Sequence, residues 1–243
     1  KNIVCEKPLI INKKEYNKLK TLTKLYKFNL LTCFYRRYLD RFLYIKKIIN
    51  KGYLGKILYF EIKYFHNEKN HPTANITRGK KIPWRFNKKV SGGGNIVDMG
   101  IHAIDLINFF IGNIKSVSAI KKNQIKLYNV EDISVVNFEL ENNVIGHGSW
   151  CSTAPFKEDL FIIYGRKGTV SFTMNFGEKD DVVIRLKNKV FKKKIKMKTP
   201  LHKNMFKKFI ENFIFFNEKK IYKIDENGFK NSKILFNILN INT

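Results

Sequence analysis

The chain has 243 residues, of which 44% are hydrophobic, so it is long enough to bury one or two cores. It contains no apolar run of about 18 residues and no secretory signal pattern, which predicts a cytoplasmic protein without a membrane span. The three cysteines are odd in number, widely spaced and without a CxxC pair. This pattern argues against a disulfide framework and a zinc site, so we expect no metal.

The formal net charge of +27 would ordinarily indicate a nucleic-acid or anionic-membrane partner. Only seven of the 47 basic residues are arginine, however, whereas nucleic-acid surfaces favour arginine for bidentate contacts. The lysines are scattered along the whole chain among many Asn, Ile, Phe and Tyr residues, a mixture typical of AT-rich coding bias. We therefore expect neither nucleic acid nor membrane as a partner.

The first 35 residues have the pattern of a parallel α/β unit. Residues 2–5 (NIVC) form a short apolar strand, 12–27 an amphipathic helix and 29–35 a second buried strand. No element precedes the first strand, which predicts that the chain is the later part of a larger domain. Pro8 ends this strand, and in such a tight turn the Lys7–Pro8 bond can be either cis or trans.

The rest of the chain changes from helices to closely spaced strands. A helix over 38–51 precedes a long strand at 56–66, a polar loop at 67–90 and a helix over 91–112. Seven further strands are then predicted at 115–124, 132–140, 143–151, 159–165, 168–174, 181–187 and 189–197. Helices over 201–216 and 226–240 close the chain. Turn signals between these short strands predict a largely antiparallel sheet.

The segment 91–106 (SGGGNIVDMGIHAIDL) is unlike the rest of this basic chain, because no Lys or Arg occurs between Lys89 and Lys115. At about 100° per residue, Asp98, His102 and Asp105 fall on one narrow stripe of a helix that is otherwise apolar. The stripe could simply face water, but exposed helices in this chain carry lysine. We therefore expect Asp98 and His102 to be functional, and Asp105 either to bind substrate, to orient His102 or to cap a neighbour.

Other interpretations of these residues are weaker. Asp98 and His102, four residues apart, could share a metal ion, but no further ligand is evident. SGGG could bind phosphate, but it matches neither GxGxxG nor GxxxxGK[ST], so close packing at the helix start is the plainer role. Lys7 is a second candidate, because it follows a buried strand at the carboxyl end, where ligands bind in open α/β sheets.

These segments together resemble one protein family. VCEKPL at 4–9, YRRYLDRF at 35–42, GYLGKI at 52–57 and SGGGNIVDMGIHAIDL at 91–106 resemble, in order and spacing, the glucose–fructose oxidoreductase/inositol dehydrogenase (Gfo/Idh/MocA) family. GHGSW at 146–150 and IYGRKGTVSF at 163–172 resemble its C-terminal sheet. The resemblance implies an α/β fold: the end of a Rossmann domain in 1–36, then in 37–243 a substrate-binding and oligomerisation α+β domain with a large, mainly antiparallel, open-faced sheet.

The resemblance also implies roles for individual residues. The catalytic group would be Lys7, His102 and Asp98, with Lys7 beside the nicotinamide and His102 transferring the proton. The residues implied to contact the cofactor are Glu6, Lys7, Pro8, Arg36, Trp84 and Arg85; those implied to contact substrate are Lys7, Asp98, His102 and Asp105. Arg37 completes a basic pair with Arg36, and Cys33 stands where some relatives carry a cofactor-contacting Asn.

The implied function is an NAD- or NADP-dependent dehydrogenase acting on CH–OH groups of a sugar or polyol. The family's GxGxxG turn is absent from these 243 residues, so a truncated sequence, a split or degraded gene, and a protein without the activity all stay open. We expect the chain alone to bind cofactor poorly or not at all. The alternative is a non-catalytic oligomerisation or scaffold module, and a homo-oligomer paired through the open sheet face is expected.

Overall fold

The computed structural model describes residues 1–67, 83–175, 181–196, 198–211 and 224–240. Most of the predicted loop at 67–90 and the end of the predicted helix at 201–216 lie outside these ranges. The described elements follow the predicted order closely, and most ends differ by one to three residues.

The N-terminal segment is the predicted strand–helix–strand unit. Strand β1 (Asn2–Cys5) pairs in parallel with β2 (Asn29–Thr32), and α1 (Lys13–Leu25) connects them. The side chain of Asn12 caps α1 by accepting a hydrogen bond from the Glu15 amide, which satisfies a donor that the helix leaves free. The Lys7–Pro8 bond is cis and lies just beyond the carboxyl end of β1.

The large sheet has eight strands in the order β10-β9-β8-β7-β3-β6-β5-β4. Every pairing is antiparallel except that of β3 with β6, which confirms the predicted mainly antiparallel sheet. The strands are β3 (Ile57–Asn67), β4 (Ile114–Lys122), β5 (Ile133–Leu140), β6 (Ile145–Ala154), β7 (Glu158–Gly165), β8 (Gly168–Phe172), β9 (Asp181–Leu186) and β10 (Lys189–Lys194).

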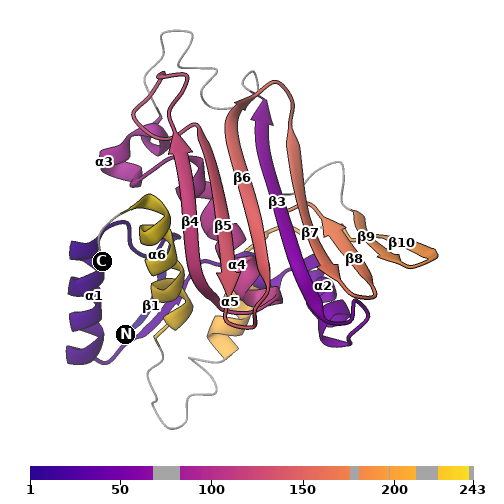
Figure 1. The fold of residues 1–243 in the computed structure, drawn as a ribbon. Helices are drawn as coiled ribbons and strands as arrows, with labels where there is room; N and C mark the ends of the chain where they lie inside the picture. Colours follow the sequence, from indigo (N-terminus) through magenta and orange to yellow (C-terminus); the bar gives the residue numbers. More distant parts are fainter. Residues whose placement is uncertain (68–82, 176–180, 197, 212–223, 241–243) are drawn as a thin grey trace.

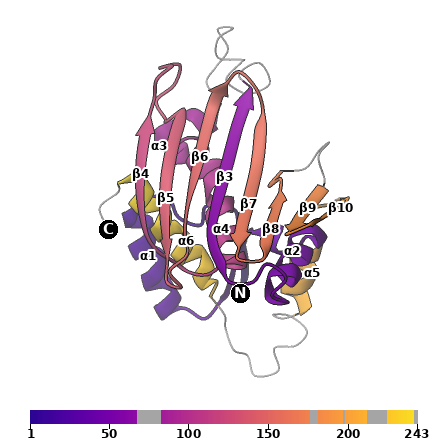
Figure 2. The ribbon, with the colours of Figure 1, turned by 45° about the vertical axis from the view of Figure 1, so that its right-hand side comes forward.

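One face of the sheet carries the core and the other carries no helix (Figures 1 and 2). Along β5 and β6, buried residues alternate with more exposed ones, because successive side chains point to opposite faces. On the covered face, Phe161 stacks on Phe172 with ring centroids 4.9 Å apart, and Phe42 of helix α2 (Asp40–Asn50) meets Phe172 edge-on. Burying each such ring stabilises the fold by roughly 1.5–3 kcal/mol.

The segment predicted as one helix over 91–112 is built in three pieces. Helix α3 (Lys88–Ser91) ends at Gly92, whose φ of 82° suits glycine. A π-helical turn, η5 (Ile96–Gly100), then leads into α4 (Ile101–Phe110). The prediction of one continuous helix over 91–112 was therefore wrong for the start of this segment. A Cβ on Gly94 would lie 2.4 Å from the Glu131 carbonyl oxygen, so this close approach requires glycine before the helix begins.

The last helix links the two parts of the chain. Helix α6 (Glu226–Leu239) packs against α4, against β4 of the large sheet and against β2 of the N-terminal strand–helix–strand unit. Just before it, the Asp225 carboxylate accepts a hydrogen bond from the Thr32 amide at the end of β2. Among the described residues, no helix combines the length and apolar character that crossing a membrane requires.

Candidate active site

Lys7 and Asp98 meet at the carboxyl end of β1, although 91 residues separate them in sequence. Lys7 Nζ donates hydrogen bonds to Asp98 Oδ1 at 2.6 Å and to the Asp98 carbonyl oxygen at 2.5 Å. The Arg85 Nε atom lies 3.6 Å from the second carboxylate oxygen, Oδ2. Burial lowers the pKa of the Lys7 ammonium, and the Asp98 carboxylate opposes this shift. Lys7 is thus a fixed cation whose position is set by one carboxylate.

His102 lies one helical turn beyond Asp98 and is 3% exposed. Its ring meets the edge of Tyr35 with centroids 5.7 Å apart, and Tyr35 in turn contacts His202 at 4.4 Å. Among the described residues, His102 Nδ1 has no hydrogen-bond partner. Burial, with the nearby charges of Arg36, Lys7 and His202, lowers the pKa of His102 well below its ordinary value. The imidazole is therefore neutral near pH 7 and able to accept a proton.

The three polar residues of the stripe all face the first 38 residues of the chain. Asp98 contacts Lys7, His102 contacts Tyr35, and Asp105 contacts Arg37. This position explains why the segment lacks lysine: nearly every residue of α4 is buried, either in the core or against the N-terminal part.

The Asp105 carboxylate is buried and bonded to side chains of other segments of the chain. It is 1% exposed, and Arg37 Nε lies 2.9 and 2.8 Å from its two carboxylate oxygens. Asn231 of α6 donates a further hydrogen bond of 2.9 Å to Oδ1. These contacts fit the expectation that Asp105 caps a neighbouring group and do not support contact with substrate. A buried carboxylate paired in this way ties the η1 turn (Tyr35–Tyr38), α4 and α6 together.

Neither alternative for the SGGG–Asp–His segment gains support. The amide of Gly94, the last glycine of SGGG, already donates a 2.7 Å hydrogen bond to Glu131 Oε1. Within the described ranges, no group of three His, Cys, Asp or Glu side chains is arranged to hold a metal ion.

The residues expected on the cofactor side differ in exposure. Trp84 is 57% exposed and carries the Arg85 guanidinium over its ring at 4.4 Å, and Glu6 is also exposed. Arg36, in contrast, is 2% exposed and donates a 3.0 Å hydrogen bond to Asn175. Burial raises the pKa of the Cys33 thiol to about 11, so this cysteine stays protonated. The geometry leaves Trp84 and Arg85 accessible and encloses Arg36 within protein.

The sequence did not point to two residues that lie close to the site, His202 and Asn175. His202 contacts Tyr35, and Asn175 accepts a hydrogen bond from Arg36. His202 directly precedes α5 (Lys203–Ile210), and Asn175 follows β8. Neither belongs to a motif, and each lies about 70 or more residues from His102 in sequence. Only the tertiary fold brings them together, so no local signal could have found them.

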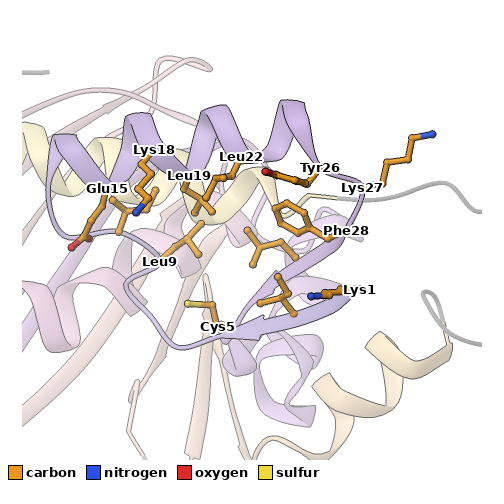
Figure 3. Close-up of a pocket in the computed structure, with 13 residues that line it drawn as sticks. Lys1, Cys5, Leu9, Glu15, Lys18, Leu19, Leu22, Tyr26, Lys27 and Phe28 are labelled. Atoms are coloured by element: carbon orange, nitrogen blue, oxygen red, sulfur yellow. The ribbon is translucent and has the colours of Figure 1, made fainter.

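One hollow lies away from Lys7, Asp98 and His102. A groove of about 650 Å³ runs between α1 and the β1–β2 pair, lined mainly by apolar side chains such as Leu9, Leu19, Leu22 and Phe28 (Figure 3). Lys7, Asp98 and His102 are not part of its lining. The groove is therefore a feature of the N-terminal unit and not of the Lys7–His102 centre.

A sequence model of the GFO/IDH/MocA C-terminal domain matches residues 42–171, more than half of the chain. The chain belongs to the Gfo/Idh/MocA family. The match covers α2, the Asp98–His102 segment and the sheet as far as β8, and it confirms the resemblance inferred from the motifs.

Several relatives with curated names are oxidoreductases or dehydrogenases, and one is named as a hydratase. Oxidoreductase P35 of Formosa agariphila is 28% identical over 175 residues, which is 71% of this chain and 52% of that protein. Glucose-6-phosphate 3-dehydrogenase of Bacillus subtilis is 30% identical over 155 residues, 59% of this chain and 42% of the relative. The chain thus spans about half the length of these relatives.

Solved structures of the same fold cover the chain almost completely. A levoglucosan dehydrogenase in complex with NADH superposes with a TM-score of 0.75 at 21% identity, over 99% of this chain and 71% of that one. An NAD binding oxidoreductase from Klebsiella pneumoniae gives 0.74 at 17% identity, over 99% and 72%. At these identities the likeness shows the fold alone: an α/β protein with the large open-faced sheet.

Proposed function

We propose that this chain is the substrate-binding part of an NAD(P)-dependent oxidoreductase that moves a hydride between nicotinamide and a CH–OH carbon of a sugar, polyol or related carbonyl compound. The observation that carries the proposal is the Lys7–Asp98 pair at the end of β1, one helical turn from a buried His102 whose pKa is lowered by burial and also by the Lys7 charge. Family membership and the named dehydrogenase relatives support the same class of reaction.

The residues present fit the nicotinamide side of such a cofactor. Ligands of open α/β sheets bind beyond the carboxyl ends of the strands, where Glu6, Lys7 and Pro8 follow β1. The accessible Trp84–Arg85 pair lies beside Asp98 at the same edge. When bound, NAD(P) supplies the hydride acceptor or donor, and the protein supplies placement and proton transfer.

The residues of this chain would have the following roles in the reaction. His102, kept neutral by burial, would accept the hydroxyl proton of the substrate. The Lys7 ammonium polarises the same oxygen and stabilises the negative charge that develops on it. Asp98 holds Lys7 in position, and its partly exposed carboxylate can also accept a hydrogen bond from a neighbouring substrate hydroxyl.

The N-terminal unit supports the expectation that this chain alone binds cofactor poorly. Its sheet has only two strands, α1 contributes no buried residue, and the groove beneath α1 is open. Fluorescence titration of the purified chain with NADH and NADPH tests this expectation directly. Tight binding would contradict it.

The proposed activity is tested by turnover. The full-length protein, incubated with NAD⁺ or NADP⁺ and a panel of sugars and polyols, should reduce the nicotinamide with at least one substrate. Failure of the whole panel with both cofactors, in protein that is folded and binds NAD(P), would favour the scaffold alternative instead.

We further propose that copies of the chain pair through the open sheet face. Ile120 and Val135 are cross-strand partners there, 69% and 40% exposed, and Ile145 is 57% exposed. A Val135→Glu substitution should dissociate the oligomer in size-exclusion chromatography, because it places a charge on the contact surface. Tyr53→Glu, in the turn after α2 and 48% exposed, is the control away from the sheet and should leave the oligomer intact.

A further inference from the structure

A buried polar network lies next to the reaction centre and joins three distant segments. The Arg36 Nη2 atom donates a 3.0 Å hydrogen bond to Asn175 Oδ1. The side-chain nitrogen of Asn175, Nδ2, in turn donates a hydrogen bond to the Tyr64 hydroxyl on β3. Asn175 therefore holds Arg36 with one end of its amide and the sheet with the other.

The backbone around Asn175 is fixed independently of its side chain. Arg41, which is fully buried, donates through Nη1 to the Thr173 and Asn175 carbonyl oxygens at 3.2 and 3.0 Å. The Asp159 carboxylate accepts from the Met174 and Asn175 amides, both at 2.7 Å. Charged groups thus hold the main chain of 173–175, and truncating the Asn175 side chain would leave these four bonds in place.

Arg36 is placed to act on His102 and Lys7. Its guanidinium lies over the Tyr35 ring at 5.7 Å, and the edge of that ring packs against His102. After burial itself, the Arg36 charge is the strongest influence lowering the pKa of His102, ahead of Lys7 and His202. Arg36 also helps burial to lower the pKa of Lys7.

The remaining charged groups around His102 are accounted for. Lys7 approaches from the end of β1 and His202 from the residue before α5, and both disfavour protonation of the ring. On the helix of His102 itself, Asp98 is held by Lys7 and Asp105 by Arg37. The causes that lower the pKa of His102 are burial first and then the charges of Arg36, Lys7 and His202, so the position of Arg36 bears on the ring.

We propose that Asn175 is a positioning residue: it holds the Arg36 guanidinium against the Tyr35 ring, which packs on His102, so that a fixed positive charge stays beside the imidazole. Its catalytic meaning rests on the proposed function, but the electrostatic relationship does not. Arg36 is accordingly assigned to the reaction centre as an electrostatic group rather than as a cofactor ligand.

The test is an NMR titration of the His102 imidazole in the purified chain, which requires neither cofactor nor turnover. The titration runs from about pH 8 towards acid as far as the protein stays folded, and the wild-type midpoint should lie below the ordinary histidine value of about 6.5. In Asn175→Ala the midpoint should move upward, and in Arg36→Gln it should move further, whereas Arg36→Lys should stay closer to wild type because it keeps the charge. Asn113→Ala, which removes an exposed amide bonded to Glu141, is the control and should change nothing.

The outcomes are distinct. A merely structural role would lower the melting temperature of Asn175→Ala and leave the His102 midpoint unmoved, and this result would overturn the proposal. If Asn175→Ala fails to fold, Tyr64→Phe is the second variant, because it keeps Asn175 but removes the hydroxyl that the Asn175 side chain binds. The His102 midpoint should then move upward by a smaller amount. An unmoved midpoint in Tyr64→Phe would also overturn the proposal. An inactive protein with the predicted midpoints would reject the proposed function alone.

Discussion

The Lys7 ammonium is bound by both the carboxylate and the carbonyl oxygen of Asp98, at 2.6 and 2.5 Å, with His102 one helical turn further on. This pair joins the strand–helix–strand unit to the central helix at the point where β1 ends. Because burial and Asp98 act on the Lys7 pKa in opposite directions, the ammonium stays charged while its position is fixed. A fixed cation can stabilise an alkoxide, and a neutral imidazole beside it can accept the proton that the hydroxyl loses as the alkoxide forms.

Replacing Lys7 should remove most of the activity and little of the stability. In the full-length protein, Lys7→Met keeps the side-chain length but cannot stabilise negative charge on the substrate oxygen, so kcat/KM should fall by about 10²–10³-fold. Lys14→Met, on the exposed surface of α1, is the control and should retain wild-type turnover. Equal turnover in the two variants would exclude Lys7 from the chemistry.

Replacing His102 should slow proton transfer. For His102→Asn we expect kcat to fall by about 10²–10⁴-fold, since a general base is lost, with the KM for substrate changed less. The steady-state rate is to be measured across pH, and the dependence on an unprotonated group should disappear in the variant. A variant that keeps the wild-type rate and pH profile would show that another group accepts the proton.

The Arg37–Asp105 pair should be important for stability. Arg37→Ala leaves the buried Asp105 carboxylate without its main partner and should lower the free energy of unfolding by roughly 3–5 kcal/mol, measured by urea denaturation. The double variant Arg37→Met/Asp105→Leu should be less destabilised than Arg37→Ala, because it leaves no isolated charge. If Arg37→Ala unfolds at the wild-type urea concentration, the pair contributes nothing measurable.

Acid should destabilise the protein through His102. In the unfolded chain this histidine has an ordinary pKa of about 6.5, whereas burial lowers its pKa in the folded state. The unfolded state therefore binds more protons as the pH falls below about 6.5, and the free energy of unfolding should fall by up to about 1.4 kcal/mol per pH unit. Comparing His102→Gln with wild type by denaturation at several pH values isolates this contribution; parallel curves would contradict it.

Much of this fold could be predicted from local patterns in the sequence. Closely spaced strands separated by turn signals predicted the mainly antiparallel sheet, and the lysine-free segment predicted a covered helix. The π turn at Ile96–Gly100 was missed, because the periodicity of a short apolar segment does not distinguish it from an α-helix.

The candidate site could be predicted only where its residues lie in motifs. Lys7, Asp98 and His102 were found in this way, but the partner of Asp105 was not, since Arg37 and Asn231 approach from opposite ends of the chain. Asn175 and His202 carry no sequence signal at all. The predicted domain boundary after residue 36 stays a prediction, because α6 packs on both sides of it.

The most direct test is a crystal structure of the full-length protein with NAD(P) and a turned-over sugar or polyol. We predict the reacting substrate oxygen within hydrogen-bonding distance of both Lys7 Nζ and the His102 ring, with its carbon facing the nicotinamide. A substrate oxygen bound elsewhere, or an imidazole that the substrate cannot reach, would contradict the assignment of Lys7 and His102 to one reaction centre.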